Sequence, residues 1–424
     1  MLDLNPILDS RLSTGTKGVP PSGEGVMIRD VAAQGWNLLD GSIPMPAAVL
    51  RSSALHDNLM AFQTYIDQAG VKLAPHGKTS MCPQLFDRQL QAGAWGMTVA
   101  TFAQACTALR YGVKRLLIAN ELVGETEIRA LAAVEDAHIL SLVDSVAGVE
   151  RIEAILQNAG VQKPFGVLVE LGIEGGRTGA RGAAVAMDVA RRVAQSPVLA
   201  LAGVEGYEGL IVTGDAVADA ARVDGFLRDL KHLFETCRAE GLFVDAPILS
   251  AGGSAYFDLV ARGLKTEGVT TLVRSGCYLT HDTGFYQRLL AHVGERAVQG
   301  SGLGPAPALK PALEVWAQVV SRPEAGLILV NAGRRDLSDD SGLPRVEVWA
   351  RPGKDAQPQP VSGWNFTRMN DQHGYVRVPE DAAVAVGDYI ALSISHPCTT
   401  FDRWPLLLEV DDAYRVVGAL KTFF

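Results

Sequence analysis

The strongest constraint on the fold of this chain is a series of eight short apolar runs in its first two thirds. They are VKLAPH (71–76), GMTVAT (96–101), RLLIAN (115–120), HILSLVD (138–144), FGVLVEL (165–171), LAGVEGYEG (201–209), PILSAGG (247–253) and TTLVRSG (270–276). Nearly continuous apolar runs are typical of strands buried on both faces, as in a parallel sheet. Between them lie segments with helical spacing, among them 80–92, 102–110, 183–194 and 226–238. Strand-then-helix units in this number predict a closed (β/α)₈ barrel.

A doubly wound open sheet is the main alternative for such an alternating pattern. That fold usually has fewer strands and carries a Gly-x-Gly-x-x-Gly turn after the first one. Here the first run ends in Pro-His-Gly-Lys-Thr (75–79) instead. We therefore predict the barrel.

The character of the sequence changes after Gly300. The run GSGLGPAPALKP (300–311) is rich in Gly and Pro and is typical of a linker. It is followed by LEVWAQVVS, LILVNAG, RVEVWA, GYVRVP, DYIALSIS and YRVVGAL, whose alternation and intervening turns predict an antiparallel β domain. We predict three parts: an N-terminal segment (1–43) that packs on the β domain, the barrel (44–299) and the C-terminal β domain (300–424).

The composition is that of a soluble globular protein, with 48% hydrophobic and 20% charged residues. Acidic residues outnumber basic ones by 47 to 38, and the net charge of −9 argues against a nucleic-acid or anionic-membrane partner. We expect no transmembrane helix and no signal peptide. The five cysteines are odd in number and widely spaced, which favours free or metal-binding thiols in a reducing cytoplasm.

Candidate catalytic residues lie where the predicted strands end, because functional side chains of barrels gather at the C-terminal ends of the strands. Lys78 follows the first strand, and apolar surroundings would lower its pKa and free its amine to attack a carbonyl. Glycine-rich turns, at 252–254 and 276–278, follow strands seven and eight, where barrels commonly bind phosphate. A carbonyl-capturing lysine beside an anion site indicates pyridoxal phosphate. The alternatives are a solvated lysine and turns that are merely tight.

Two more strand ends supply candidates for the same site. Arg177 could hydrogen-bond the cofactor ring oxygen or a substrate carboxylate, and Tyr207 could pack on the cofactor or donate to it. Packing or loop roles are the alternative for both. The predicted cofactor-binding residues are thus Lys78, Arg177, Tyr207, Gly252, Gly253, Ser254, Gly276, Cys277 and Tyr278.

A second constellation, Ser-His-Pro-Cys-Thr-Thr (395–400), follows an apolar strand of the β domain. His396 and Cys398 point to the same side of an extended chain, and imidazole with thiolate is a soft pair suited to Zn²⁺. No second pair of this kind completes a closed structural site, so two ligands with open positions would suit a catalytic metal. The alternative is a buried histidine beside a free cysteine. His76 is a further candidate for this pocket.

Taken in order, several segments resemble the D-serine dehydratase and D-threonine aldolase family, which are fold-type III pyridoxal phosphate enzymes with an alanine racemase-like barrel. The segments are PMPAAVLRSSALHDNLMAF, APHGKT, GMTVAT, the Gly-Gly-Ser turn, SGCY, NAGRRDLSDDSGLP, NDQHGYV and SHPCTTFDRW. The resemblance spans roughly residues 44–424. It implies that Lys78 holds the cofactor and that His396 and Cys398 bind a divalent metal, commonly Zn²⁺, with Mn²⁺ or Mg²⁺ as alternatives. The aldolase branch more often resembles His-x-Asp at this place, so Cys398 favours the dehydratase.

The expected reaction is β-elimination from a D-β-hydroxy amino acid, such as D-serine, D-threonine or a D-3-hydroxyaspartate, to a 2-oxo acid and ammonia. The predicted catalytic residues are Lys78, His396 and Cys398. An aldolase that releases glycine and an aldehyde is the alternative enzyme. Two further alternatives are a racemase, which would need a second base, and a non-catalytic carrier of the cofactor. Such a carrier would resemble the barrel alone. Relatives of this fold usually pair, so we expect a homodimer.

Overall fold

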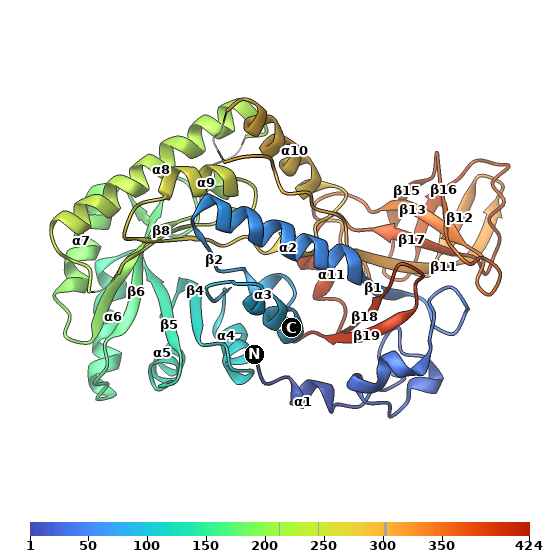
Figure 1. Cartoon of the computed structure of the whole chain (residues 1–424), viewed down its shortest axis with the longest axis horizontal. Coiled ribbons are helices and arrows are strands. Elements are labelled where there is room, and N and C mark those ends of the chain that lie inside the picture. The colour runs from blue at the N-terminus through green and yellow to red at the C-terminus, as the bar shows by residue number, and fades with distance from the viewer. Residues whose placement is uncertain (212, 245, 301–302) are drawn as a thin grey trace.

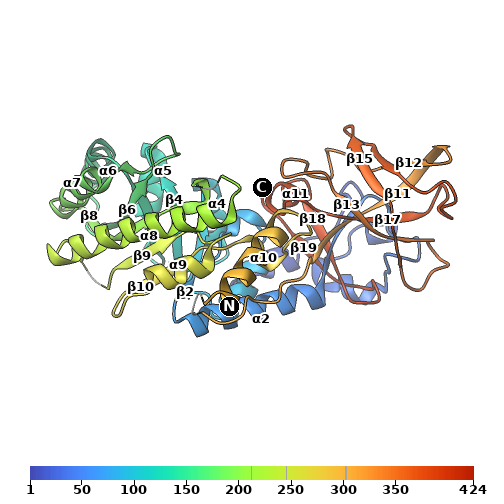
Figure 2. The same ribbon diagram turned by 90° about the horizontal axis from the view of Figure 1, so that it is seen from above.

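A closed parallel barrel forms one lobe of the molecule and a curled antiparallel sheet forms the other (Figure 1). The structure is a computed structural model that describes residues 1–211, 213–244, 246–300 and 303–424. Residues 301–302 of the predicted linker lie outside the described residues. Figure 2 shows the two lobes side by side, with α10 (Phe285–Val298) near their junction.

The eight apolar runs form the eight strands of the barrel, so this prediction is confirmed. The strands are β2 (Lys72–Leu73), β3 (Met97–Val99), β4 (Arg115–Glu121), β5 (His138–Val143), β6 (Phe165–Gly172), β8 (Leu199–Gly206), β9 (Ile248–Ala251) and β10 (Thr270–Val273), and the short β7 (Ala180–Arg181) pairs with β6. The barrel closes between β2 and β3, where the Trp95 N–H donates to Leu73 O at 2.7 Å and the Thr98 N–H donates to Pro75 O at 2.9 Å. Inward-facing Leu117, Leu140 and Leu168 belong to the apolar cluster that fills its interior.

Helices cover the outside of the barrel (Figure 1). They are α2 (Ser52–Ala69), α3 (Pro83–Gln91), α4 (Phe102–Arg110), α5 (Glu125–Ala132), α6 (Val146–Asn158), α7 (Ala183–Ala194), α8 (Ala216–Ala239), α9 (Phe257–Leu264) and α10. The helix predicted at 226–238 begins earlier, at Ala216, because the Asp215 carboxylate accepts hydrogen bonds from two N–H groups of the first turn and caps it. No helix in the described parts of the chain has both the length and the apolar character of a membrane span.

The second sheet has the strand order β14-β13-β17-β11-β1-β18-β19, and β12, β15 and β16 extend it from β11. Its strands are β1 (Ala47–Arg51), β11 (Leu313–Glu324), β12 (Leu327–Val330), β13 (Arg345–Ala350), β14 (Gln359–Pro360), β15 (Asn365–Met369), β16 (Gly374–Arg377), β17 (Tyr389–Ser393), β18 (Leu406–Val410) and β19 (Val416–Lys421). The short helix α11 (Cys398–Phe401) follows β17. The antiparallel β domain predicted from the alternating runs is therefore confirmed.

One boundary differs from the prediction. β1 falls within the range assigned to the barrel (44–299), but it pairs antiparallel with β11 and parallel with β18 of the second sheet. A strand followed by a long helix has the same sequence pattern in either place, and only the pairing partner distinguishes the two. The barrel strands therefore begin at β2.

The N-terminal segment, which contains α1 (Asn5–Leu8), packs on the second sheet. The Leu38 N–H donates to Tyr414 O at 3.0 Å, and the Val416 N–H donates to Trp36 O at 2.9 Å. Trp36 and Leu38 are buried in one apolar cluster with Trp316 of β11. This segment thus covers the face of the sheet that would otherwise be exposed.

Candidate active site

A cavity of about 440 Å³ opens where the C-terminal ends of the barrel strands meet the β domain. It brings together most of the residues that the sequence analysis selected. They are Lys78, Arg177, Tyr207, Gly252, Ser254, Gly276, Cys277, His396 and Cys398, and His76 also lines the cavity. Segments that are far apart in the sequence therefore form one candidate active site.

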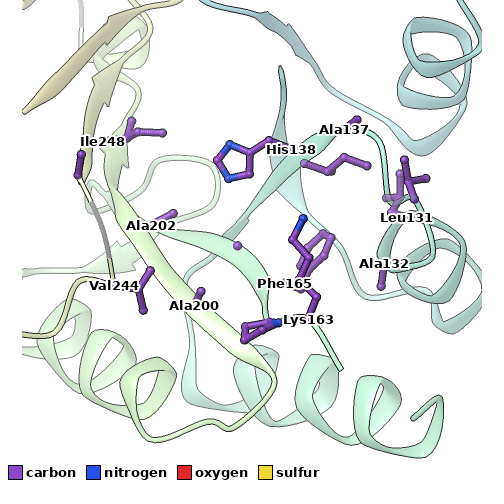
Figure 3. A pocket seen from close by; sticks show the side chains of 15 residues that line it. Leu131, Ala132, Ala137, His138, Lys163, Phe165, Ala200, Ala202, Val244 and Ile248 are labelled. Carbon is purple, nitrogen blue, oxygen red and sulfur yellow. The ribbon is translucent and has the colours of Figure 1, made fainter. Parts of the chain in front are cut away.

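A second cavity, of about 360 Å³, lies at the opposite end of the barrel. Figure 3 shows it between the starts of β5, β6 and β8, with His138, Phe165 and Ala200 in its wall. None of the predicted site residues lines it. Because barrel enzymes use the C-terminal ends of their strands, we place the chemistry in the first cavity.

Lys78 lies in the 3₁₀ turn Gly77–Thr79 directly after β2. Its side chain is exposed to the cavity, so the apolar surroundings expected for this lysine are wrong for this structure. Polar side chains such as Asn120 and Arg177 line the cavity with it, and the Lys78 side chain is exposed. His76 next to it is partly buried. Loss of solvation, together with the nearby charges of Lys78 and Arg274, holds the pKa of its imidazole well below the usual range, and its Nδ1 has no hydrogen-bond partner in the described residues.

The glycine turns after β9 and β10 have different roles. The N–H groups of Gly252 and Gly253 both donate to the Glu208 carboxylate, at 3.0 and 2.6 Å, and so they are not free to bind an anion. A Cβ at Gly276 would lie 2.7 Å from His76 O, so only glycine fits where this turn meets the lysine loop.

A candidate anion site remains in the cavity that Lys78 lines. Four groups donate no hydrogen bond within the described residues: the backbone N–H groups of Ser254, Gly276 and Cys277, and the Ser254 hydroxyl. Ser254, Gly276 and Cys277 all line the cavity. A primary amine together with convergent N–H donors fits a phosphorylated aldehyde such as pyridoxal phosphate.

Arg177 and Tyr207 form one wall of the cavity. The Arg177 guanidinium lies 4.9 Å from the centre of the Tyr207 ring, and one of its nitrogens is 4.0 Å from the Glu170 carboxylate. The Arg177 side chain is half exposed, so its charge is available to an anionic ligand. Burial and the neighbouring Glu208 raise the pKa of Tyr207, which keeps its phenol protonated.

Two predicted cofactor residues do not line this cavity. Gly253 has a left-handed backbone (φ 74°), and a Cβ there would lie 2.8 Å from the Val273 side chain. Tyr278 is buried and stacks on Phe62 at 4.2 Å between ring centres, while its hydroxyl accepts a hydrogen bond from Gln89 at 3.0 Å. Both residues support the loop rather than face the cavity.

His396 and Cys398 reach the cavity from the loop after β17 and the start of α11. The His396 Nδ1 lies 2.7 Å from Asp340 Oδ2. Burial alone would lower the pKa of His396, but Cys398 and Asp340 outweigh it and raise this pKa to about 9. The Cys398 thiol donates to Thr79 Oγ1 at 3.4 Å, which brings it to the loop that carries Lys78.

The donor set fits a divalent metal with two protein ligands. Asp340 engages the Nδ1 atom of His396 and leaves Nε2 for a metal, which is the usual carboxylate–histidine arrangement at metal sites. In the described parts of the chain, no three histidine, cysteine or carboxylate side chains are grouped to hold a metal ion. Substrate or water would therefore complete the coordination.

Sequence reasoning missed several residues of this site. Asn120 lies one residue before the end of β4 and donates to Ala100 O at 3.1 Å, and its position near a strand end was a usable signal. Tyr286 lies in the first turn of α10, which is capped by the buried Asp282 through the Tyr286 N–H at 3.0 Å. Asp340 had no signal in the sequence beyond its place in a segment quoted for the family resemblance.

Comparison with known proteins supports the same fold and chemistry. The family model described as "Putative serine dehydratase domain" matches residues 312–410. A D-threonine aldolase from Arthrobacter sp is 27% identical over 87% of this chain and 90% of its own length. A D-threo-3-hydroxyaspartate dehydratase from Delftia sp. (strain HT23) is 27% identical over 86% of this chain and 93% of its own length.

Solved structures agree with these similarities. The D-threonine aldolase from Filomicrobium marinum superposes with a TM-score of 0.74 and 26% identity, covering 92% of this chain and 97% of its own. An alanine racemase-like protein from Idiomarina loihiensis has the same fold, with a TM-score of 0.69 and 16% identity over 89% of this chain and 96% of its own. A D-threo-3-hydroxyaspartate dehydratase has been solved as a cysteine-to-alanine mutant in the metal-free form.

The fold and these relatives define an enzyme, a pyridoxal phosphate-dependent lyase on an alanine racemase-like barrel. The resemblance to the D-serine dehydratase and D-threonine aldolase family, stated from the sequence, is confirmed.

Proposed function

We propose that the chain is a metal-assisted dehydratase that converts a D-β-hydroxy amino acid to a 2-oxo acid and ammonia. The observation that carries this proposal is the position of His396 and Cys398 in the same cavity as Lys78. A metal-binding pair beside a reactive amine suits a reaction that removes a proton from one carbon and hydroxide from the next. D-Serine, D-threonine and D-3-hydroxyaspartate are substrates of this type.

The barrel provides the cofactor site in this proposal. Pyridoxal phosphate, when bound, supplies an aldehyde for a lysine amine and an electron sink for charge that develops at the substrate Cα. Lys78 is the proposed lysine, and its amine accepts the Cα proton. The N–H groups of Ser254, Gly276 and Cys277 are the proposed phosphate donors. Arg177 is the proposed partner of the substrate carboxylate.

The β domain provides the metal site. His396 and Cys398 would hold a divalent ion, and Zn²⁺ suits this soft pair best. The metal would act as a Lewis acid on the departing β-hydroxyl, because hydroxide is a poor leaving group. Support comes from the metal-free form of the cysteine-to-alanine mutant of a D-threo-3-hydroxyaspartate dehydratase. We further propose that the protein is a cytoplasmic homodimer.

A D-threonine aldolase-type cleavage is the second candidate, because an aldolase covers 87% of this chain at 27% identity. In that reaction a base removes the β-hydroxyl proton and the Cα–Cβ bond breaks, which gives glycine and an aldehyde. We favour the dehydratase because the motif at 396–398 is His-x-Cys rather than His-x-Asp.

Product analysis tests the proposal. The purified chain, supplied with pyridoxal phosphate and Zn²⁺, is incubated with D-serine, D-threonine and D-threo-3-hydroxyaspartate in separate reactions. We expect equal amounts of ammonia and the corresponding 2-oxo acid, and no turnover by Lys78→Ala. Lys72→Ala, at an exposed lysine of β2 outside the cavity, is the matched control and should remain active. Release of glycine without ammonia would overturn the dehydratase in favour of the aldolase.

A further inference from the structure

Two thiols meet where the barrel and the β domain join. Cys277 begins the 3₁₀ turn after β10, Cys398 begins α11, and their sulfur atoms are 3.5 Å apart. The Thr79 hydroxyl lies against both sulfurs, at 3.9 Å from Cys277 and 3.4 Å from Cys398. Among the described residues, this is the one pair of cysteines in contact.

The proposed reaction uses only one of these two thiols. Cys398 belongs to the proposed metal pair, whereas Cys277 contributes only its backbone N–H to the proposed phosphate site. The other three cysteines have no cysteine neighbour in the described structure: Cys82 and Cys237 are buried, and Cys106 is exposed. A second thiol in contact with a metal-binding thiol therefore calls for its own explanation.

The geometry is close to that of a disulfide. Bonded sulfurs lie about 2.05 Å apart, so the two atoms need to approach by about 1.5 Å. Neither cysteine lies within a strand, because each starts a short helix. Both side chains line the 440 Å³ cavity, which admits a small oxidant to the sulfurs.

We propose that Cys277 and Cys398 are an oxidative modification site, which a peroxide converts to a reversible disulfide that blocks metal binding. The Cys398 thiolate attacks a peroxide oxygen, the O–O bond breaks, and hydroxide leaves with a sulfenic acid on Cys398. The Cys277 sulfur then attacks the sulfenic sulfur, and the second oxygen leaves as water. In total, two thiols are oxidised and one hydrogen peroxide is reduced to two waters. A dithiol reductant restores both thiols by exchange.

A metal and this disulfide exclude each other, because both need the lone pairs of the Cys398 thiolate. Bound Zn²⁺ protects the thiolate, and the disulfide leaves His396 as a single ligand. The disulfide itself is independent of the reaction proposed above, whereas the loss of metal rests on that proposed function.

The test treats the purified full chain with hydrogen peroxide, once after removal of metal with EDTA and once after loading with Zn²⁺. Thiols are counted with Ellman's reagent in denaturant, and cross-linked peptides are identified by mass spectrometry. In the metal-free sample we expect the five thiols to fall to three, with one Cys277–Cys398 cross-link that dithiothreitol reverses. In the Zn²⁺-loaded sample we expect at least about tenfold slower oxidation.

Two variants sharpen the result. Cys277→Ser should abolish the cross-link, and Cys106→Ser, at an exposed cysteine away from the cavity, should leave it unchanged. Retention of five thiols in the metal-free wild type, or a cross-link between other cysteines, would overturn the proposal. Formation of the disulfide with bound Zn²⁺ retained would overturn the exclusion. If the disulfide forms but the reduced chain binds no metal, the modification site stands and the metal role of the proposed function fails.

Discussion

Replacement of Asp340 by Asn should weaken metal binding at His396 and Cys398 without unfolding the chain. The Asp340 carboxylate lies 2.7 Å from His396 Nδ1 and also accepts a hydrogen bond from Thr399 Oγ1 at 3.1 Å. Asparagine keeps the volume but removes the charge. Its NH₂ group can donate to Nδ1, which places the ring proton on Nε2, the nitrogen that would bind the metal.

The size of the effect follows from the single contact that is lost. Loss of an outer-sphere partner of a metal-bound histidine typically costs about 10- to 100-fold in affinity, which corresponds to about 1.4–2.8 kcal/mol. The pH decides how much of this loss of metal affinity can be measured. The carboxylate also raises the pKa of His396 and so favours the proton that competes with the metal. The Asn variant reduces this competition, which partly offsets its loss of metal affinity. At pH 9, which matches the His396 pKa of about 9, the proton competes with the metal only about twofold, so the larger orienting effect remains visible.

The assay is competition for Zn²⁺ with a chromophoric chelator at pH 9. The matched control is Asp339→Asn, which changes the neighbouring carboxylate that lies 3.3 Å from Arg334 and makes no contact with His396. We expect Asp340→Asn to bind Zn²⁺ at least about tenfold more weakly, and Asp339→Asn to match the wild type. Equal affinities for all three proteins would refute the proposed role of Asp340.

Further predictions concern packing and the junction of the lobes. Gly276→Ala should destabilise the fold by about 1–3 kcal/mol and weaken cofactor binding, because its Cβ would meet His76 O at 2.7 Å; thermal unfolding and the cofactor absorbance check this. Gly294→Ala in α10, where no atom lies within 4 Å of the new Cβ, should instead stabilise by about 0.5–1 kcal/mol. Arg88→Ala should cost about 2 kcal/mol in the free energy of unfolding by denaturant, because it leaves the nearly buried Glu409 carboxylate without its two hydrogen bonds.

The barrel was predictable from the sequence because burial on both faces of a parallel strand leaves a local signature. Each of the eight apolar runs carries that signature within a few residues. β1 shows the limit of such reasoning. The pattern AAVLR followed by a helix is the same for a barrel strand and for a strand of the second sheet, and only its pairing with β11 and β18 tells them apart.

The site was predictable where a residue type is diagnostic by itself. A lysine after the first strand and a His-x-Cys motif can be recognised without a structure, and the structure places Lys78, His396 and Cys398 in one cavity. The contact between Cys277 and Cys398 was not predictable, because 121 positions separate them and neither neighbourhood signals the other. Likewise, the occupation of the Gly252 and Gly253 N–H groups by Glu208 depends on a carboxylate from another loop.

Because each lobe supplies only part of the site, its geometry depends on how firmly the lobes are docked. Gln84 of α3 donates to Ala419 O of β19 at 2.8 Å and accepts from the Lys421 N–H at 2.9 Å. Arg88 of α3 donates two hydrogen bonds to Glu409 of β18, the strand that pairs with β19. α3 directly follows the loop that carries Lys78, so these contacts tie the lysine loop to the β domain. Weakening them should therefore impair metal-assisted turnover before it affects the barrel itself.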